Sequence, residues 1–79
     1  MLGMTLGTRS TLVQQVISRL SEQIRSGAWP VGAKIPTEPQ LGEMLGVGRN
    51  TVREAVRALT HAGVLECRQG SGTYVLSTD

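Results

Sequence analysis

The chain has 79 residues, which is enough for one small domain with a single core and excludes a nucleotide-binding α/β sheet, a barrel or a two-domain cleft. Hydrophobic residues make up 39% and charged residues 18%, a balance typical of folded rather than disordered chains. The net charge is only +2, but seven of the eight cationic residues are Arg, which suits bidentate contacts with phosphate and guanine. Composition alone leaves nucleic-acid binding open.

The chemistry available to the chain is limited by its single cysteine, Cys67, and its single histidine, His61. Together they exclude an internal disulfide and a zinc site, and they favour a reducing compartment. No apolar run is long enough to span a bilayer, and the N-terminus lacks the basic-then-apolar pattern of a signal peptide. We therefore expect a cytoplasmic protein with no cofactor, no metal and no membrane partner.

Apolar spacing predicts a first helix from about residue 11 to residue 26, after a flexible tail at residues 1–10. Aliphatic residues recur three and four positions apart and form one stripe: Leu12, Val13, Val16, Ile17, Leu20 and Ile24. Gly27 follows as a C-terminal stop. In the connector after it, we expect Trp29 to cover one end of the core and a short strand to form near Lys34 and Ile35.

Two further helices follow, joined by a tight turn. Thr37 opens a helix of about eight residues that ends at Gly46. Its inward residues are predicted to be Leu41, Met44 and Leu45. The third helix runs from about residue 49 to residue 62. Its inward residues are predicted to be Val52, Ala55, Val56 and Leu59.

The C-terminal segment predicts a β-hairpin. Residues 64–69 and 72–76 read as strands, and Gly70-Ser71 reads as a two-residue turn. That turn pairs Cys67 with Tyr74 and Leu65 with Leu76 on the core face, and Arg68 with Thr73 on the outer face. Cys67 is then a small core residue. A β-hairpin directly after a helix-turn-helix predicts an α+β, mainly α fold, a winged helix-turn-helix over residues 11–76.

Arginines line the third helix at positions 49, 53 and 57, spaced four residues apart. Like charges at this spacing cost a helix about 0.2–0.5 kcal/mol per pair, and a polyanion would relieve that cost. A solvated basic face explains the triplet equally simply. The second helix of a helix-turn-helix, however, inserts its first residues into the major groove. We therefore predict DNA contacts by Gly48, Arg49, Asn50, Thr51 and Arg53.

The tip of the hairpin is the second candidate contact. Glycines there let the backbone approach a phosphate or the minor groove, Arg68 supplies charge, and Gln69 can reach base edges. The predicted contacts are Arg68, Gln69, Gly70, Ser71 and Gly72. Lys34 and Thr37 complete the candidate site, although a solvated lysine and a simple helix cap explain them as well.

Three segments resemble the DNA-binding domain of the GntR family of bacterial transcription regulators: GAWPVGAKIPTE (27–38), LGEMLGVGRNTVREAVRAL (41–59) and GVLECRQGSGTYV (63–75). The resemblance covers roughly residues 12–76 and implies a winged helix-turn-helix that binds a short palindromic operator as a dimer, typically as a repressor. It implies that Arg49, Asn50, Thr51 and Arg53 contact DNA. It also implies that Gln69 and Gly70 enter the minor groove.

The chain departs from the family pattern at two positions. Pro39 stands where members often carry an Arg, and Gly48 stands where they often carry Ser or Thr. The first change removes one DNA contact, and the second removes a helix cap and a hydroxyl for phosphate. We expect somewhat weaker binding or a shifted operator preference.

The resemblance also implies a C-terminal domain that binds an effector and dimerises, and Asp79 ends the chain where that domain would begin. We expect residues 77–79 to start a linker to this absent domain. The full-length protein would be a homodimer, whereas this segment alone could be monomeric. The REAVRAL run (53–59) resembles the subgroup with an all-helical effector domain.

Three rival functions remain at this point. A winged helix can bind a protein partner, which would require no Arg-Asn-Thr cluster at the start of the third helix. The domain could also bind duplex DNA without sequence preference. An enzyme is the weakest rival, because the sequence offers no pairing of a nucleophile with a base.

Overall fold

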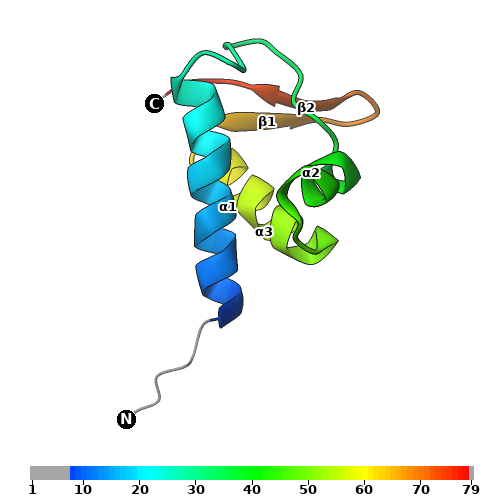
Figure 1. The fold of residues 1–79 in the computed structure, drawn as a ribbon. Coiled ribbons are helices and arrows are strands. Elements are labelled where there is room, and N and C mark those ends of the chain that lie inside the picture. The colour runs from blue at the N-terminus through cyan, green and yellow to red at the C-terminus, as the bar shows by residue number, and fades with distance from the viewer. Residues whose placement is uncertain (1–7, 79) are drawn as a thin grey trace.

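The computed structural model describes residues 8–78 and contains three helices followed by a two-stranded antiparallel hairpin (Figure 1). The elements are α1 (Thr8–Arg25), α2 (Glu38–Leu45), α3 (Arg49–His61), β1 (Leu65–Arg68) and β2 (Gly72–Val75). This order confirms the predicted winged helix-turn-helix. Most of the predicted tail at residues 1–10 lies outside the described residues, and α1 begins earlier than expected, at Thr8.

The core is aliphatic, and all three helices and both strands contribute to it. Helix α1 packs against α3, and Leu20 and Ile24 are fully buried members of its stripe. The prediction that the stripe begins at Leu12 is wrong, since that side chain is 38% exposed. The predicted inward face of α3 is confirmed. The buried apolar residues are Val16, Leu20, Ile24, Ile35, Leu41, Val52, Ala55, Val56, Leu59, Leu65 and Val75. Trp29 is partly buried against this cluster, as expected for a residue that covers its edge.

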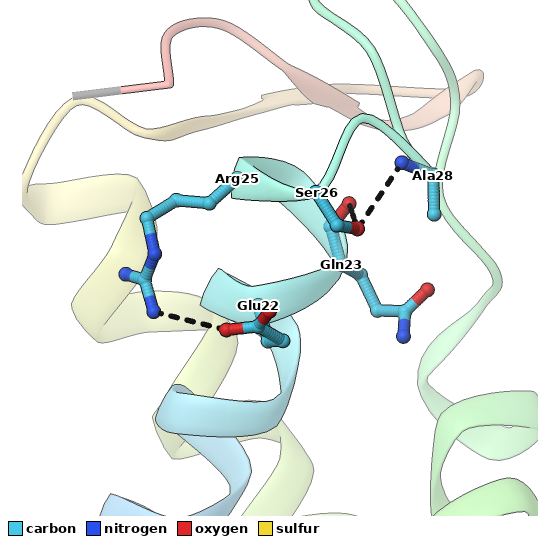
Figure 2. Close-up of polar contacts among 5 residues, drawn as sticks. All are labelled: Glu22, Gln23, Arg25, Ser26 and Ala28. Carbon is cyan, nitrogen blue, oxygen red and sulfur yellow. Dashed lines mark hydrogen bonds and ion pairs between the residues drawn. The ribbon is translucent and has the colours of Figure 1, made fainter.

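The C-terminus of α1 is closed by short-range contacts (Figure 2). The Ser26 hydroxyl donates to the Gln23 carbonyl at 3.2 Å and accepts from the Ala28 amide at 3.4 Å. One turn earlier, a terminal nitrogen of Arg25 pairs with the Glu22 carboxylate at 3.3 Å. The last carbonyl groups of the helix are satisfied by the Ser26 hydroxyl and by the amides that follow it, since Gly27 donates to Ile24 at 3.2 Å and Trp29 to Gln23 at 3.0 Å.

The second helix is capped at both ends. The Thr37 hydroxyl accepts from the Gln40 amide, and the Gln40 side chain accepts from the Thr37 amide at 2.8 Å, which completes a capping box. At the other end, Gly46 takes the left-handed conformation with φ of 69°, and its amide donates to the Gly42 carbonyl. The chain then reaches α3 through residues 46–48 alone, which fixes the angle of the helix-turn-helix.

The predicted inward orientation of Met44 is wrong. Among the residues of α2, all of which are described, Leu41 is buried and Met44 is 64% exposed. Leu45 is partly buried on the Leu41 side. At about 100° per residue, Leu45 lies about 40° to one side of Leu41, whereas Met44 lies about 60° to the other side. That rotation takes Met44 off the narrow face that α2 packs against α3.

The hairpin register also differs from the prediction by one residue. The observed pairs are Leu65 with Val75, Glu66 with Tyr74, Cys67 with Thr73, and Arg68 with Gly72. The loop therefore contains three residues, 69–71, rather than two. The Ser71 amide closes it by donating to the Arg68 carbonyl at 2.9 Å, and Gly70 takes a φ of 79°. One extra loop residue changes every cross-strand partner, so Val75 enters the core and Tyr74 faces outward with Glu66.

A third extended segment flanks the hairpin, as predicted for the connector. Lys34 forms a β-bridge with Tyr74, and the Ile35 amide donates to the Thr73 carbonyl at 2.9 Å. The Val75 amide donates in turn to the Ala33 carbonyl at 2.9 Å. As a result β2 is hydrogen-bonded on both edges, which ties the hairpin to the helical body.

Candidate nucleic-acid interface

The first turn of α3 presents polar side chains to solvent. Gly48, Arg49 and Asn50 are all exposed. The N-cap residue, Gly48, has no side chain that could accept a hydrogen bond from the backbone amides of the first turn. Arg49 forms no ion pair within the described part of the chain. The structure therefore brings together two side chains suited to base edges with a helix start suited to an anion.

Thr51 occupies a different environment from its neighbours. It is only 8% exposed and is the polar member of the buried residues described. At this degree of burial the Thr51 side chain does not project freely into solvent, unlike the exposed residues Arg49 and Asn50.

Arg53 is exposed one turn into α3, but it is not free. Its Nε donates to Glu38 Oε1 at 3.4 Å, across the junction between α3 and the first turn of α2. Arg57, a further turn along, is exposed and forms no ion pair within residues 8–78. In the described chain, the middle arginine of this row, Arg53, is therefore ion-paired, whereas Arg49 and Arg57 at either end of it are not.

We call the hairpin, residues 65–75, the wing. Its loop residues Gln69, Gly70 and Ser71 are exposed, and the loop projects on the side of the molecule away from α1 (Figure 1). Arg68, at the base of the loop, donates from Nε to Glu66 Oε1 at 3.0 Å.

The outward face of the wing is ordered by Tyr74. The Arg68 guanidinium lies 4.1 Å from the centre of the Tyr74 ring, a cation–π distance. The Tyr74 hydroxyl forms a short hydrogen bond with the Ser71 hydroxyl. One aromatic side chain therefore contacts both the charged residue and the loop residue that were predicted to meet DNA.

Lys34 and Thr37 lie near the two candidate surfaces in different ways. The Lys34 side chain crosses the wing beside Gly72, with Nζ 3.4 Å from the position that a Gly72 Cβ would occupy. Thr37 is exposed, but its hydroxyl already accepts the capping hydrogen bond from Gln40. The lysine therefore places a cation at the wing, and the threonine acts first as a helix cap.

The prediction that Cys67 is a core residue is wrong, since its thiol is exposed. The corrected register puts Cys67 opposite Thr73, near the loop and past the buried Leu65–Val75 pair. There it lines an open groove between the wing and the outer face of α3, together with Arg57, His61 and Thr73. Within residues 8–78, His, Cys, Asp and Glu side chains form no group of three that could hold a metal ion.

Sequence reasoning missed three residues at this interface: Glu38, Glu66 and Tyr74. Both glutamates had signals, since Glu38 follows the cap of α2 and Glu66 lies two residues before Arg68 on one strand face. The one-residue error in the predicted register places Tyr74 on the opposite face.

In the described residues, no helix is long and apolar enough to cross a membrane.

Comparisons with known proteins identify relatives for nearly the whole chain. The family model described as "Bacterial regulatory proteins, gntR family" matches residues 12–75. The mannosyl-D-glycerate transport/metabolism system repressor MngR of Escherichia coli is 47% identical over 64 residues, which cover 81% of this chain and 27% of that protein. The chain thus spans just over a quarter of the length of such curated relatives.

Solved structures of GntR proteins and DNA-binding domains also superpose on this chain. The Streptococcus agalactiae GntR structure superposes with a TM-score of 0.74 at 54% identity, covering 82% of this chain and 31% of that one. The AraR DNA-binding domain in complex with operator ORR3 superposes with a TM-score of 0.78 at 39% identity, covering 81% of this chain and 77% of that one.

Proposed function

Since this chain belongs to the gntR family of bacterial regulatory proteins and forms its winged helix-turn-helix DNA-binding domain, we propose that it reads a short operator in duplex DNA through the start of α3 and the tip of the wing. The DNA-binding domain of AraR, which is 39% identical to this chain, is seen in complex with operator ORR3. The relatives MngR and the histidine utilization repressor are repressors, and we extend that role to the protein that carries this domain.

The observation that carries the proposal is the state of the first turn of α3. Gly48, Arg49 and Asn50 are exposed, and Arg49 is not neutralised by any described carboxylate. Arg can donate two hydrogen bonds to guanine O6 and N7, and Asn can pair with adenine N6 and N7. We assign Arg49 and Asn50 to base contacts in the major groove, and Gly48, Thr51 and Arg53 to contacts that fix the helix in the groove.

The wing supplies the second contact in this proposal. The exposed loop residues Gln69, Gly70 and Ser71 would lie at the minor groove, and Gly70 has no side chain to hold the backbone away from DNA. Arg68, Gly72 and Lys34 lie at the base of the loop, where their cations and backbone can meet phosphates. Thr37 would have a lesser role, as the cap of a helix whose N-terminus could face a phosphate in the complex.

A single domain of this size reads only a few base pairs. We therefore propose that the full protein binds a palindromic operator in the cytoplasm as a homodimer, with one half-site per domain. Linking two domains raises the effective concentration of the second, so the isolated domain would bind its half-site weakly. Pro39 and Gly48, where the resemblance favours Arg and Ser or Thr, would shift the operator preference away from that of relatives.

The experiment that tests this function is the selection of bound sequences from a pool of random duplex DNA. We expect an enriched motif whose central base pairs depend on Arg49 and Asn50. Enrichment of no motif despite binding would favour DNA binding without sequence preference. Absence of binding at 50 mM salt would exclude the proposal and favour a winged helix that recognises protein.

A further inference from the structure

We propose that Glu38 and Glu66 are specificity-determining residues, which hold Arg53 and Arg68 by their Nε edges and so reduce the affinity for DNA other than the operator. This inference rests on the proposed function, because both arginines belong to the proposed DNA-binding surface. It concerns residues that carry the wrong charge for contact with DNA.

The two ion pairs share one geometry. Arg53 donates from Nε to Glu38 at 3.4 Å, and Arg68 donates from Nε to Glu66 at 3.0 Å. In both pairs the carboxylate occupies the side of the guanidinium, so the two terminal nitrogens are left for another acceptor. The Arg25–Glu22 pair of α1 differs, because there a terminal nitrogen contacts the carboxylate (Figure 2).

The shared geometry arises twice from unrelated parts of the fold. Glu38 projects from the first turn of α2 toward α3, whereas Glu66 and Arg68 lie two residues apart on one face of β1. The side chains of the two glutamates, Glu38 and Glu66, are 35% and 43% exposed, so solvent screens the two ion pairs only in part. Arg49, the proposed base reader, has no carboxylate of this kind in the described chain.

A carboxylate that holds the Nε of an arginine affects binding to operator DNA and binding to other DNA unequally. Binding without sequence preference depends on how many phosphates the protein neutralises, and an arginine that is already paired neutralises a phosphate poorly. In an operator complex, the free terminal nitrogens of Arg53 can meet an acceptor in the major groove and those of Arg68 an acceptor at the minor groove, while each carboxylate keeps Nε. The glutamates therefore penalise binding to phosphate alone more than binding in the correct register.

Substitutions can separate charge from geometry. Gln keeps an oxygen that can accept from Nε but removes the charge, whereas Ala removes both. We would measure binding of the 79-residue chain by fluorescence anisotropy at several salt concentrations, on the duplex selected by the wild-type chain and on a scrambled duplex of the same composition. The matched control is Glu22→Gln, which removes one carboxylate from an exposed ion pair on α1.

We expect Glu38→Gln and Glu66→Gln each to tighten binding to the scrambled duplex about threefold to tenfold at 0.1 M salt, and to steepen its salt dependence by roughly one unit, as for one more neutralised phosphate. Affinity for the selected duplex should change by less than about twofold, so the ratio of the two affinities falls. Glu38→Ala should in addition weaken binding to the selected duplex, because Arg53 loses its orientation. Glu22→Gln should change neither slope nor ratio.

The proposal is overturned if Glu38→Gln and Glu66→Gln give the same scrambled-duplex affinity and salt slope as Glu22→Gln. Thermal unfolding of each variant establishes that the chain is folded at the assay temperature, and Glu66→Gln serves as an independent test if Glu38→Gln weakens α2. A wild-type chain that prefers no duplex would contradict the proposed function instead, so the two failures are distinguishable.

Discussion

Lys34 lies across the wing at Gly72, so closely that a Cβ on Gly72 would be 2.5 Å from Lys34 Cε. The glycine also has a φ of 150°, a conformation that residues with a Cβ rarely adopt. The connector, the strand β2 and the loop of the wing therefore meet at a position that requires glycine.

Substitution of Gly72 by Ala should lower the free energy of unfolding by about 1–2 kcal/mol, mainly through the backbone conformation, because the end of the lysine side chain can move aside. Urea denaturation measures the change. The comparison variant is Gly48→Ala, where φ is −71° and no atom lies within 4 Å of the new Cβ, so that only the weaker N-cap preference of Ala lowers its stability. Equal stability of the two variants would contradict the assignment of strain to Gly72.

The core predicts a large difference between two apolar residues. Leu20 is 1% exposed in the core, so Leu20→Ala should cost about 2–4 kcal/mol in the free energy of unfolding. Met44 is 64% exposed, so Met44→Ala should cost less than about 0.5 kcal/mol. Comparable losses in urea denaturation would mean that α2 packs through Met44, as the sequence suggested.

The missing cap of α3 can be restored. Gly48→Ser should raise the free energy of unfolding by roughly 0.3 kcal/mol, since a serine hydroxyl can accept from an amide in the first turn. The same hydroxyl should tighten binding to duplex DNA through a phosphate contact. Gly48→Ala supplies the Cβ without the hydroxyl, so tighter binding by both variants would argue against that contact.

Arg49 is the residue on which base recognition depends most in our proposal. Arg49→Ala should cost about 1–3 kcal/mol in binding free energy and relax the preference at one operator position, as expected for a bidentate guanine contact. Repeated selection from random duplex DNA with the variant measures both effects. Arg19→Ala, which removes an exposed arginine from α1, should leave the motif unchanged. An unaltered motif for Arg49→Ala would reject its role.

Tyr74 should order the wing before DNA arrives. Tyr74→Phe removes the hydrogen bond to Ser71 but keeps the ring under Arg68, so we expect faster hydrogen exchange of the Ser71 amide with little change in overall stability. Tyr74→Leu also removes the cation–π contact and should weaken DNA binding through Arg68. Combining it with Arg68→Ala should then add little to the loss from Arg68→Ala alone.

The helices were predictable because their signals are local. The stripe from Val16 to Ile24, the cap at Thr37 and the stop at Gly46 each depend on residues within two turns, and the structure confirms all three. The exposed position of Arg49 followed from the same reasoning.

The errors occurred where the local sequence is compatible with two outcomes or where distant parts of the chain decide between them. The wing register depends on whether the loop holds two or three residues, and the sequence around Gly70 is compatible with either. One residue of difference moved Tyr74 outward and Val75 inward. The Glu38–Arg53 pair was likewise invisible, because it joins residues fifteen positions apart whose approach depends on the angle between α2 and α3.

The double pairing of β2 has one further consequence. A strand whose both edges are hydrogen-bonded offers no open backbone to a second molecule, and here β2 is bonded to β1 on one side and to residues 32–35 on the other. Sheets aggregate or exchange strands through unsatisfied edges. In the described chain the open edge is therefore that of β1, which is only four residues long and contains Glu66 and Arg68, and short charged edges discourage pairing with a second molecule.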